Sequence, residues 1–575
     1  VEVPGQLGGG TPLVLVGGAN GRLTGGRHIK YPKGTPLANF HLALLDKLGI
    51  AVDQHGNSRR RQGVDKVVFG VAAGLALVFL LYGALDSEGF GETGGSILTW
   101  ITTNFGWFFV LTSGAFLLFS VFLAATRYGN IKLGADDSVP EFSTFSWVSM
   151  MFATGMGIGL MFYGVAEPLT HLNAPPMGMA EPGSEEAAHL AMEYTFFHWG
   201  FHPWSMYAVI GLSIAYFAYR KGGGNLISAA FRPLLGDRVD GPVGQGINIL
   251  AILATLFGSA TSLGLGALQI TGGLSNVFGN DGYGTTAAAL VIAVLTVCFV
   301  ISAVSGVDKG IKWLSNANAI AAGLLVFFLF VVGPTVFILS TFTESIGGYL
   351  THLPTMSFRT GVFGGSEWLN GWTIFYWAWW VSWTPFVGMF IARISKGRTI
   401  RQFVVFVIAV PSLVSFVWFS ILGGAAFDLQ LNEGRDMAAL VDAGLESTLF
   451  DTLRSFPLSS VTVVLAVFLI AIFFVTGADS ASIVMGMLSE NGAEEPKRGL
   501  VVFWGVATGA IAAVLLFADG LSALQTGVII VGFPFLMVLI GLCVSLWKSL
   551  REETFEATLR DPLRKVVVAT KHGGG

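Results

Sequence analysis

The sequence predicts an all-α integral membrane protein with twelve transmembrane helices. Of its 575 residues, 53% are hydrophobic and only 12% are charged, and the mean hydropathy is +0.68. Apolar runs of about 20 residues recur along the chain, and each can cross the ~30 Å hydrocarbon core of a bilayer. Lys and Arg gather in alternate connecting segments, which is the usual signature of cytoplasmic loops. These observations exclude an ordinary soluble globular protein.

The order of the apolar runs gives the expected topology. They lie at about residues 66–85, 99–126, 143–166, 187–220, 243–278, 284–305, 311–342, 367–392, 400–426, 457–489, 499–518 and 522–547. With the N-terminus inside, all of the 32 Lys and Arg residues except Arg359, Arg435 and Arg454 fall in inner segments. We therefore expect both termini to be cytoplasmic.

Some functional classes find no support in the sequence. No basic cluster resembles a nucleic-acid surface, so we expect the lipid bilayer and no nucleic acid as a partner. The two cysteines, Cys298 and Cys543, lie in apolar runs and offer no disulfide framework. No nucleophile–base pair, metal triad or phosphate loop is recognisable, so we do not expect an enzyme. We assign no function to the glycine-rich tail at 1–64.

The stretch GWTIFYWAWWVSWTPF, residues 371–386, carries five of the 15 tryptophans. If it is helical, Tyr376, Trp379, Trp380, Trp383 and Phe386 lie close to one side. Core packing or membrane-interface aromatics would explain part of this density. However, the rings run through the middle of the span, and such a wall is equally typical of a pocket for a cation.

The third span contains Gly155, Gly157 and Gly159 around Met156. Because each glycine weakens a helix by up to ~1 kcal/mol, we expect the helix to break there. Close helix packing is the alternative, but packing seams use i, i+4 spacing rather than i, i+2. A broken membrane helix must line a protein cavity, where its freed backbone groups can bind substrate and ions.

The fourth span adds Trp199, Trp204 and Tyr207, which are ordinary core residues or the second half of an aromatic cage. His198 and His202 stand at i, i+4, a spacing that suits zinc. No carboxylate or third histidine lies near them in a recognisable order, so a metal site is disfavoured. The fifth span also contains the hydroxyls of Thr255 and Ser259, and the tenth contains that of Thr476. Such hydroxyls usually donate to the backbone of their own helix, and the alternative is that they bind an ion.

From about residue 65 to 549 the chain resembles the betaine/choline/carnitine transporter family, and within it the sodium-coupled glycine-betaine branch. The motifs are GWTIFYWAWWVSWTPFVGMFIARISKGR (371–398), GMGIGLMFYGVAEP (155–168) and TSLGLGALQI (261–270). The resemblance implies a LeuT-like fold with two inverted five-helix repeats. The expected division is a tail at 1–64, two extra helices at 65–140, repeats at 141–343 and 366–548, an outer surface helix at 344–365, and a C-terminal tail at 549–575.

The resemblance also implies residue roles. The quaternary ammonium of a small zwitterionic substrate would lie in a cage of Trp199, Trp204, Tyr207 and Trp380. Trp379, Trp383 and Phe386 would line the permeation path. A substrate carboxylate would suit the N–H groups freed at Gly155, Met156, Gly157 and Gly159. Choline-selective relatives tend to carry aspartate at Gly159, so its absence favours betaine.

Sodium sites follow from the same resemblance. One Na⁺ would be held by Ala153, Met156, Phe473 and Thr476, and the second by Thr255, Ser259 and the ring of Phe386. Relatives usually have a second hydroxyl after that threonine, whereas this chain has Gly477. The family further implies a homotrimer in the bacterial inner membrane. The expected function is Na⁺-coupled betaine import by alternating access. A sodium-independent betaine or carnitine exchanger, or a choline transporter, is the alternative.

Overall fold

The computed structural model describes residues 63–155, 157–279, 283–305 and 308–571. The chain from Lys66 onward forms one compact unit. Within the described residues the protein is helical, and its one β-type contact is an isolated antiparallel bridge between Lys132 and Thr399. The expected tail at 1–64 lies outside the described residues except for its last two positions. The predicted all-α class is confirmed.

The first half of the chain runs from α2 to α10. Its elements are α2 (Lys66–Leu85), α3 (Ser87–Ala125), η2 (Arg127–Asn130), α4 (Thr144–Gly155), α5 (Ile158–Asn173), η3 (Pro176–Gly178), α6 (Glu185–Trp199), α7 (Phe201–Ala215), η4 (Tyr216–Arg220), η5 (Ile227–Phe231), α8 (Arg232–Leu235), η6 (Gly236–Asp240), α9 (Pro242–Phe278) and α10 (Thr285–Ser305).

The second half runs from α11 to α19. Its elements are α11 (Asp308–Val332), α12 (Thr335–Ser357), α13 (Ser366–Leu369), η7 (Asn370–Ile374), α14 (Phe375–Ile394), α15 (Ile400–Leu431), α16 (Met437–Ala443), α17 (Thr448–Arg454), α18 (Ser459–Ser489) and α19 (Arg498–Lys571). Non-helical dihedrals at Asp519 and Gly520 interrupt α19 between the last two expected spans. The expected tail at 549–575 continues this helix to Lys571.

Among the described residues, eight helices are long and apolar enough to cross a membrane. The chain is thus a multi-pass protein by length and composition, while the count of twelve stays a prediction. The difference has a physical origin: α19 contains two expected spans, and the third and fourth expected spans are each divided into two shorter helices. The eighth expected span contains the π-turn η7 followed by the tryptophan-rich helix α14.

The two divided spans break at glycines. In the third, α4 ends at Gly155 and α5 begins at Ile158, with Gly157 in an extended conformation, so the predicted break is confirmed. In the fourth, α6 and α7 meet at Gly200, where an added Cβ would lie 2.5 Å from the Phe196 carbonyl oxygen. A side chain at this junction would therefore clash with the preceding turn.

The seventh expected span also ends earlier than the apolar run suggested. Helix α11 stops at Val332, and Gly333 and Pro334 follow, because a residue before proline disfavours the helical conformation. A separate helix, α12, then begins at Thr335 and ends at Ser357. Helix α12 therefore begins nine residues before the segment that we expected at 344–365 and includes part of the former apolar run. The position of this segment along the membrane surface stays a prediction.

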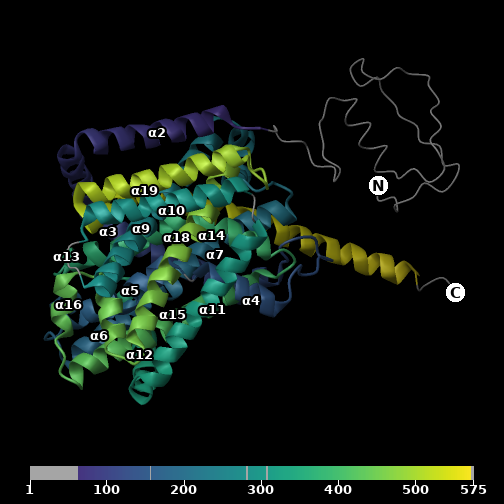
Figure 1. The fold of residues 1–575 in the computed structure, drawn as a ribbon. Helices are drawn as coiled ribbons and strands as arrows, with labels where there is room; N and C mark the ends of the chain where they lie inside the picture. Colours follow the sequence, from purple (N-terminus) through teal and green to yellow (C-terminus); the bar gives the residue numbers. More distant parts are fainter. Residues whose placement is uncertain (1–62, 156, 280–282, 306–307, 572–575) are drawn as a thin grey trace. The chain divides into compact units, whose positions relative to one another are not determined.

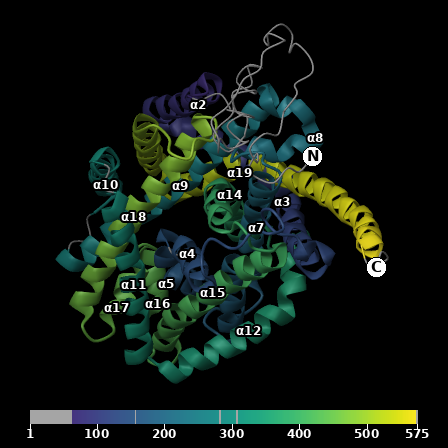
Figure 2. The same ribbon diagram turned by 90° about the vertical axis from the view of Figure 1, so that its right-hand side faces the viewer.

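Helix α14 lies in the interior of the bundle. Figures 1 and 2 show it surrounded by other helices, and it packs against α7, α9 and α19. Its residues from Phe375 to Ser382 are all buried. This position explains why its aromatic side chains face other helices rather than lipid, as membrane-interface aromatics would.

Candidate functional site

An aromatic cavity lies between α7 and α14. About 380 Å³ of space, open solvent included, lies among its side chains. The side chains around it come from the end of α6, from α7, from α14 and from α15. They are Trp199, Pro203, Trp204, Tyr207, Trp380, Trp383, Val387 and Ser415. We call this space the aromatic cavity.

The rings of the aromatic cavity meet edge to face. The Trp380 ring lies 4.9 Å from that of Trp199 at an interplanar angle of 74° and 6.3 Å from that of Tyr207 at 78°. The rings of Trp204 and Tyr207 lie 5.3 Å apart at 75°. Because neighbouring rings are nearly perpendicular, their faces point in several directions around one space. This is the arrangement that a cation needs to contact several ring faces at once.

The aromatic cavity has no charged wall. None of its eight lining residues is Asp, Glu, Lys or Arg. A net ion placed there would lose its hydration without gaining an opposite charge, which is costly. A zwitterion carries its counter-charge within itself and avoids part of that cost. The cavity therefore suits a small neutral molecule with a cationic end better than a free cation.

The structure places the predicted cage residues together. Trp199, Trp204, Tyr207 and Trp380 all line the aromatic cavity, and so does Trp383, which we had assigned to the path. The other two path residues lie beside it. The Trp379 ring stacks on that of Trp380 at 5.0 Å and 13°, and the Phe386 ring packs edge-on against Trp383 at 5.6 Å. Their roles in binding stay predictions.

Gly159 is the second residue of α5, where a backbone N–H has no partner within the helix, so its expected role in binding a carboxylate stays a prediction. The structure adds a packing role. An added Cβ would come within 2.9 Å of the Trp199 ring and 3.0 Å of the Trp379 ring. The absence of a side chain thus lets both rings pack against α5. Gly157 precedes the helix in an extended conformation, Ala153 and Gly155 belong to α4, and Met156 lies outside the described residues.

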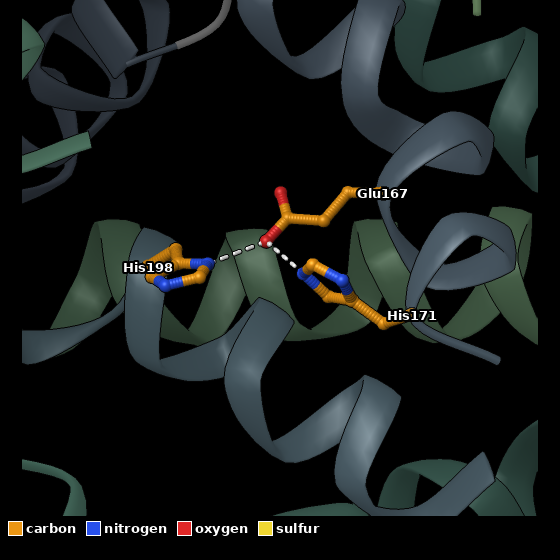
Figure 3. A group of neighbouring side chains, drawn as sticks. All are labelled: Glu167, His171 and His198. Atoms are coloured by element: carbon orange, nitrogen blue, oxygen red, sulfur yellow. Dashed lines mark hydrogen bonds and ion pairs between the residues drawn. The ribbon is translucent and has the colours of Figure 1, made fainter. Parts of the chain in front are cut away.

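A polar cluster lies directly behind the aromatic cavity. The Glu167 carboxylate accepts hydrogen bonds through Oε2 from Trp199 Nε1, at 2.7 Å, and from the Tyr376 hydroxyl. Its Oε1 lies 2.7 Å from His198 Nδ1 and 3.4 Å from His171 Nε2 (Figure 3). All of these side chains are buried. We call Glu167, His171 and His198 the polar cluster.

The polar cluster reaches two walls of the aromatic cavity. Glu167 binds the indole N–H of Trp199, and the backbone carbonyl of His198 accepts a hydrogen bond of 2.9 Å from Trp380 Nε1. Hydrogen bonds to a carboxylate are stronger than those between neutral groups. The cluster therefore fixes the orientation of both tryptophan rings.

Sequence reasoning did not find the polar cluster. Glu167 falls one residue after the expected end of the third span, so it did not stand out as an acid inside the membrane. His171 lies one turn further along α5. The histidine pair that we had considered does not form, because the break at Gly200 separates His198 from His202. The His202 ring instead stacks on Trp377 at 5.3 Å and 20°.

Thr476, Phe473 and Gly477 lie on α18, and Thr255 and Ser259 lie on α9, while Ala153 lies on α4 and Phe386 on α14. The hydroxyl of Thr476 bonds back to the Ile472 carbonyl at 2.9 Å, and that of Thr255 to the Ala251 carbonyl at 2.9 Å. Phe473 and Ser259 are buried, and Gly477 is half-buried. Helices α9 and α18 pack against each other along their length. The oxygens are therefore inside the bundle, and their use by an ion stays a prediction.

Comparison with known proteins decides the family. Residues 67–555 match the family described as BCCT, betaine/carnitine/choline family transporter. The chain belongs to this family. As a BCCT member it is a membrane transporter and not an enzyme.

Several BCCT relatives are similar over nearly their whole length. The chain is 46% identical to the glycine betaine transporter OpuD of Bacillus subtilis, over 87% of this chain and 97% of the relative. It is 46% identical to a probable glycine betaine transporter of Desulfitobacterium hafniense, over 85% of this chain and 99% of the relative. It is 41% identical to the betaine/ectoine transporter LcoP of Corynebacterium glutamicum, over 91% and 82%.

Proposed function

We propose that this protein imports glycine betaine, or a closely related zwitterionic quaternary-ammonium solute, together with Na⁺. The observation that carries the proposal is the aromatic cavity, in which Trp199, Trp204, Tyr207, Trp380 and Trp383 surround one uncharged space. A quaternary ammonium cannot lose its charge and its methyl groups do not donate conventional hydrogen bonds. Ring faces, at about 0.5–2 kcal/mol each, are a suitable host for it.

The size and polarity of the aromatic cavity favour a small zwitterion. The side chains lie close together, so only a small solute with its charges on few atoms fits between them. The indole nitrogen of Trp383 is buried and makes no hydrogen bond to any described residue. A substrate carboxylate would supply the acceptor that this N–H lacks. Choline, which has no carboxylate and a net positive charge, would leave it unpaired.

The relatives support the same substrate class. Two of the most similar are named as glycine betaine transporters, and a third as a betaine/ectoine transporter. Gly159 adds a reason from the structure, because aspartate at this position would bring its Cβ against the Trp199 and Trp379 rings. We therefore place betaine ahead of choline.

Sodium is proposed as co-transported cargo. Thr476, Phe473 and the backbone of α4 would contribute to one site, and Thr255, Ser259 and Phe386 to the other. Each Na⁺ that enters gains about 2.3 kcal/mol per 100 mV of membrane potential, so two ions can drive strong accumulation of solute. The two bundles of the inverted repeat would rock about the aromatic cavity to expose it to each side in turn.

The proposal also covers the setting of the protein. Both termini would face the cytoplasm, the membrane would be the bacterial inner membrane, and three copies would assemble into a homotrimer. Mass measurement of the protein in lipid nanodiscs gives the number of copies directly.

Uptake by reconstituted protein tests the function. Proteoliposomes are loaded without sodium, and uptake of labelled glycine betaine is followed with an inward gradient of Na⁺ or of K⁺. We expect saturable accumulation with the Na⁺ gradient only. Exchange of internal for external betaine without sodium would instead support the sodium-independent exchanger, and equal accumulation in both gradients would contradict Na⁺ coupling.

A further inference from the structure

The polar cluster brings three metal-binding atoms together in the bundle interior. Oε1 of Glu167, Nε2 of His171 and Nδ1 of His198 lie within 4.8 Å of one another. They come from α5 and α6, and Figure 3 shows both imidazole rings turned toward the same carboxylate oxygen. All three side chains have no exposed surface. Any ligand held between these atoms would be shielded from water.

His171 is the least satisfied member of the polar cluster. Both of its ring nitrogens are buried and make no hydrogen bond to any described residue. Nε2 is 3.4 Å from Glu167 Oε1, close but outside good hydrogen-bond geometry. Leaving a buried polar group unpaired costs about 1–3 kcal/mol. A neutral imidazole has one nitrogen with a free lone pair, and a metal ion would use it.

The other polar atoms of His198 and Glu167 have hydrogen-bond partners of the kind that orient metal ligands. His198 Nε2 lies 3.0 Å from the Thr373 hydroxyl, which can fix Nδ1 as the nitrogen with the free lone pair. Glu167 Oε2 accepts from Trp199 and Tyr376, which leaves Oε1 to face the histidines. Metal-binding histidines and carboxylates generally have such second partners, which orient them and raise their basicity.

We propose that Glu167, His171 and His198 bind one divalent transition-metal ion of the zinc class. Two histidines and one carboxylate form a known zinc ligand set that leaves a fourth position open. With bonds of about 2.0–2.1 Å and tetrahedral angles, ligand atoms stand about 3.3 Å apart. The separation of 3.4 Å between Glu167 and His171 matches this value. The 2.7 Å separation between Glu167 and His198 would open by about 0.6 Å on binding.

The ligand chemistry separates this metal from the transported ion. Sodium, like calcium and magnesium, is a hard cation that favours oxygen ligands, whereas imidazole nitrogen suits zinc, copper, nickel and cobalt. The metal would also join α5 to α6 just behind Trp199 and Trp380. Bound there, the metal would stiffen one wall of the aromatic cavity, whichever solute is carried.

The test measures metal content rather than transport. The full-length protein is produced in medium supplemented with Zn²⁺ or Co²⁺, because the buried site fills most readily during folding. After removal of any affinity tag and dialysis, elemental analysis gives the metal per chain. We expect about one ion per chain in both preparations. The cobalt form should show visible absorption that is stronger than that of hydrated Co²⁺ and shifted from it, because imidazole nitrogens replace water oxygens.

Two variants make the assignment specific. His171→Gln removes the unpaired imidazole and should reduce bound metal at least tenfold. His202→Gln removes a buried histidine of the same segment that contacts none of the three ligands, and it should keep the metal. Wild-type protein with only background metal and no cobalt absorption would overturn the proposal, and so would equal metal in His171→Gln. If His171→Gln does not fold, the wild-type stoichiometry and cobalt spectrum decide.

Discussion

The aromatic cavity and the polar cluster share one tryptophan but are built from opposite chemistry. The ring of Trp199 forms part of the uncharged wall, while its N–H binds the buried carboxylate of Glu167. The cavity offers mainly ring faces, with a few neutral polar groups such as the Trp383 N–H and the Ser415 hydroxyl. The polar cluster behind it consists of a carboxylate and two imidazoles, and the Tyr376 hydroxyl donates to that carboxylate.

This difference indicates a division of roles. Ring faces attract a cation without exchanging protons, so they can hold and release a solute that must pass through. Contacts between ring faces are weakly directional, so packing alone does not fix the orientation of an indole ring. Directional hydrogen bonds from Trp199 to Glu167, and from Trp380 to the His198 carbonyl, hold the two rings in place. The cavity selects the solute, and the cluster maintains the shape of the cavity.

The largest effect is expected from Trp380→Ala. This change removes a ring face and one hydrogen bond to the cluster. Loss of about 2–3 kcal/mol raises the KM for betaine uptake roughly a hundredfold. Trp107→Ala, at an exposed ring on α3, is the matched control and should transport normally. Normal KM in Trp380→Ala would remove this ring from the binding site.

Gly159→Ala should have the next largest effect. The new methyl group would press on the Trp199 and Trp379 rings at 2.9 and 3.0 Å. Overpacking costs about 1–3 kcal/mol, and we expect about a tenfold rise in KM. Gly70→Ala, where an added Cβ meets no atom within 4 Å, serves as the control. An unchanged KM in Gly159→Ala would mean that ring position does not affect binding.

Glu167→Gln should have a smaller effect on the same constant. Glutamine can still accept from Trp199 or Tyr376 but no longer carries a charge, and a loss of about 1 kcal/mol corresponds to about a fivefold rise in KM. If the cluster acts by holding rings, betaine and a bulkier betaine should respond differently, because the cavity changes shape. Equal changes for both solutes would argue against a positioning role.

The smallest effect on transport is expected far from both regions, at Glu553 in α19. Its carboxylate pairs with Arg220 and Lys221, each at 2.6 Å, and accepts from Tyr216. Burial alone would raise the pKa of Glu553, but hydrogen bonds and charges from Arg220 and Lys221 outweigh it and lower the pKa to about 2. Because the folded-state pKa lies below the ordinary value of 4.5, this contact stabilises the protein above pH 4.5. The stabilisation disappears as the pH falls toward 2.

Glu553→Gln therefore should leave KM unchanged and lower the melting temperature by about one degree at pH 7, since such a pair contributes about 1 kcal/mol and the folded unit is large. The melting difference between wild type and variant should shrink below pH 4. If Glu553→Gln raised KM as much as Glu167→Gln does, residues far from the aromatic cavity would also affect substrate binding. That result would contradict the division of roles described above.

The sequence predicts one of these two regions much better than the other. Aromatic density and helical period place the rings of α14 on one side, and glycine spacing predicts the break before α5, because both are local properties of a short stretch. The polar cluster depends on a helix end and on packing of α5 against α6. Glu167 fell at a span boundary and His171 after it, so no pattern in the sequence joined them to His198. The break at Gly200 separates His202 from His198, in line with the metal site that we disfavoured for that pair.

Other differences have the same cause. Pro334 ends α11 inside a continuous apolar run. Hydropathy alone does not predict this helix end, because proline acts through backbone geometry and not through polarity. Thr476 and Thr255 have the hydroxyls of an ion site, but within the structure they bond to their own helices, as most membrane threonines do.

Competition by a carbon isostere tests the central claim most directly. In 3,3-dimethylbutyrate the quaternary nitrogen of glycine betaine is replaced by carbon, which preserves the shape and the carboxylate but removes the positive charge. Competition with labelled betaine uptake is measured for the isostere and for unlabelled betaine. If ring faces of the aromatic cavity bind a cation, the isostere should compete at least a hundredfold more weakly. Competition at equal concentrations would contradict that account.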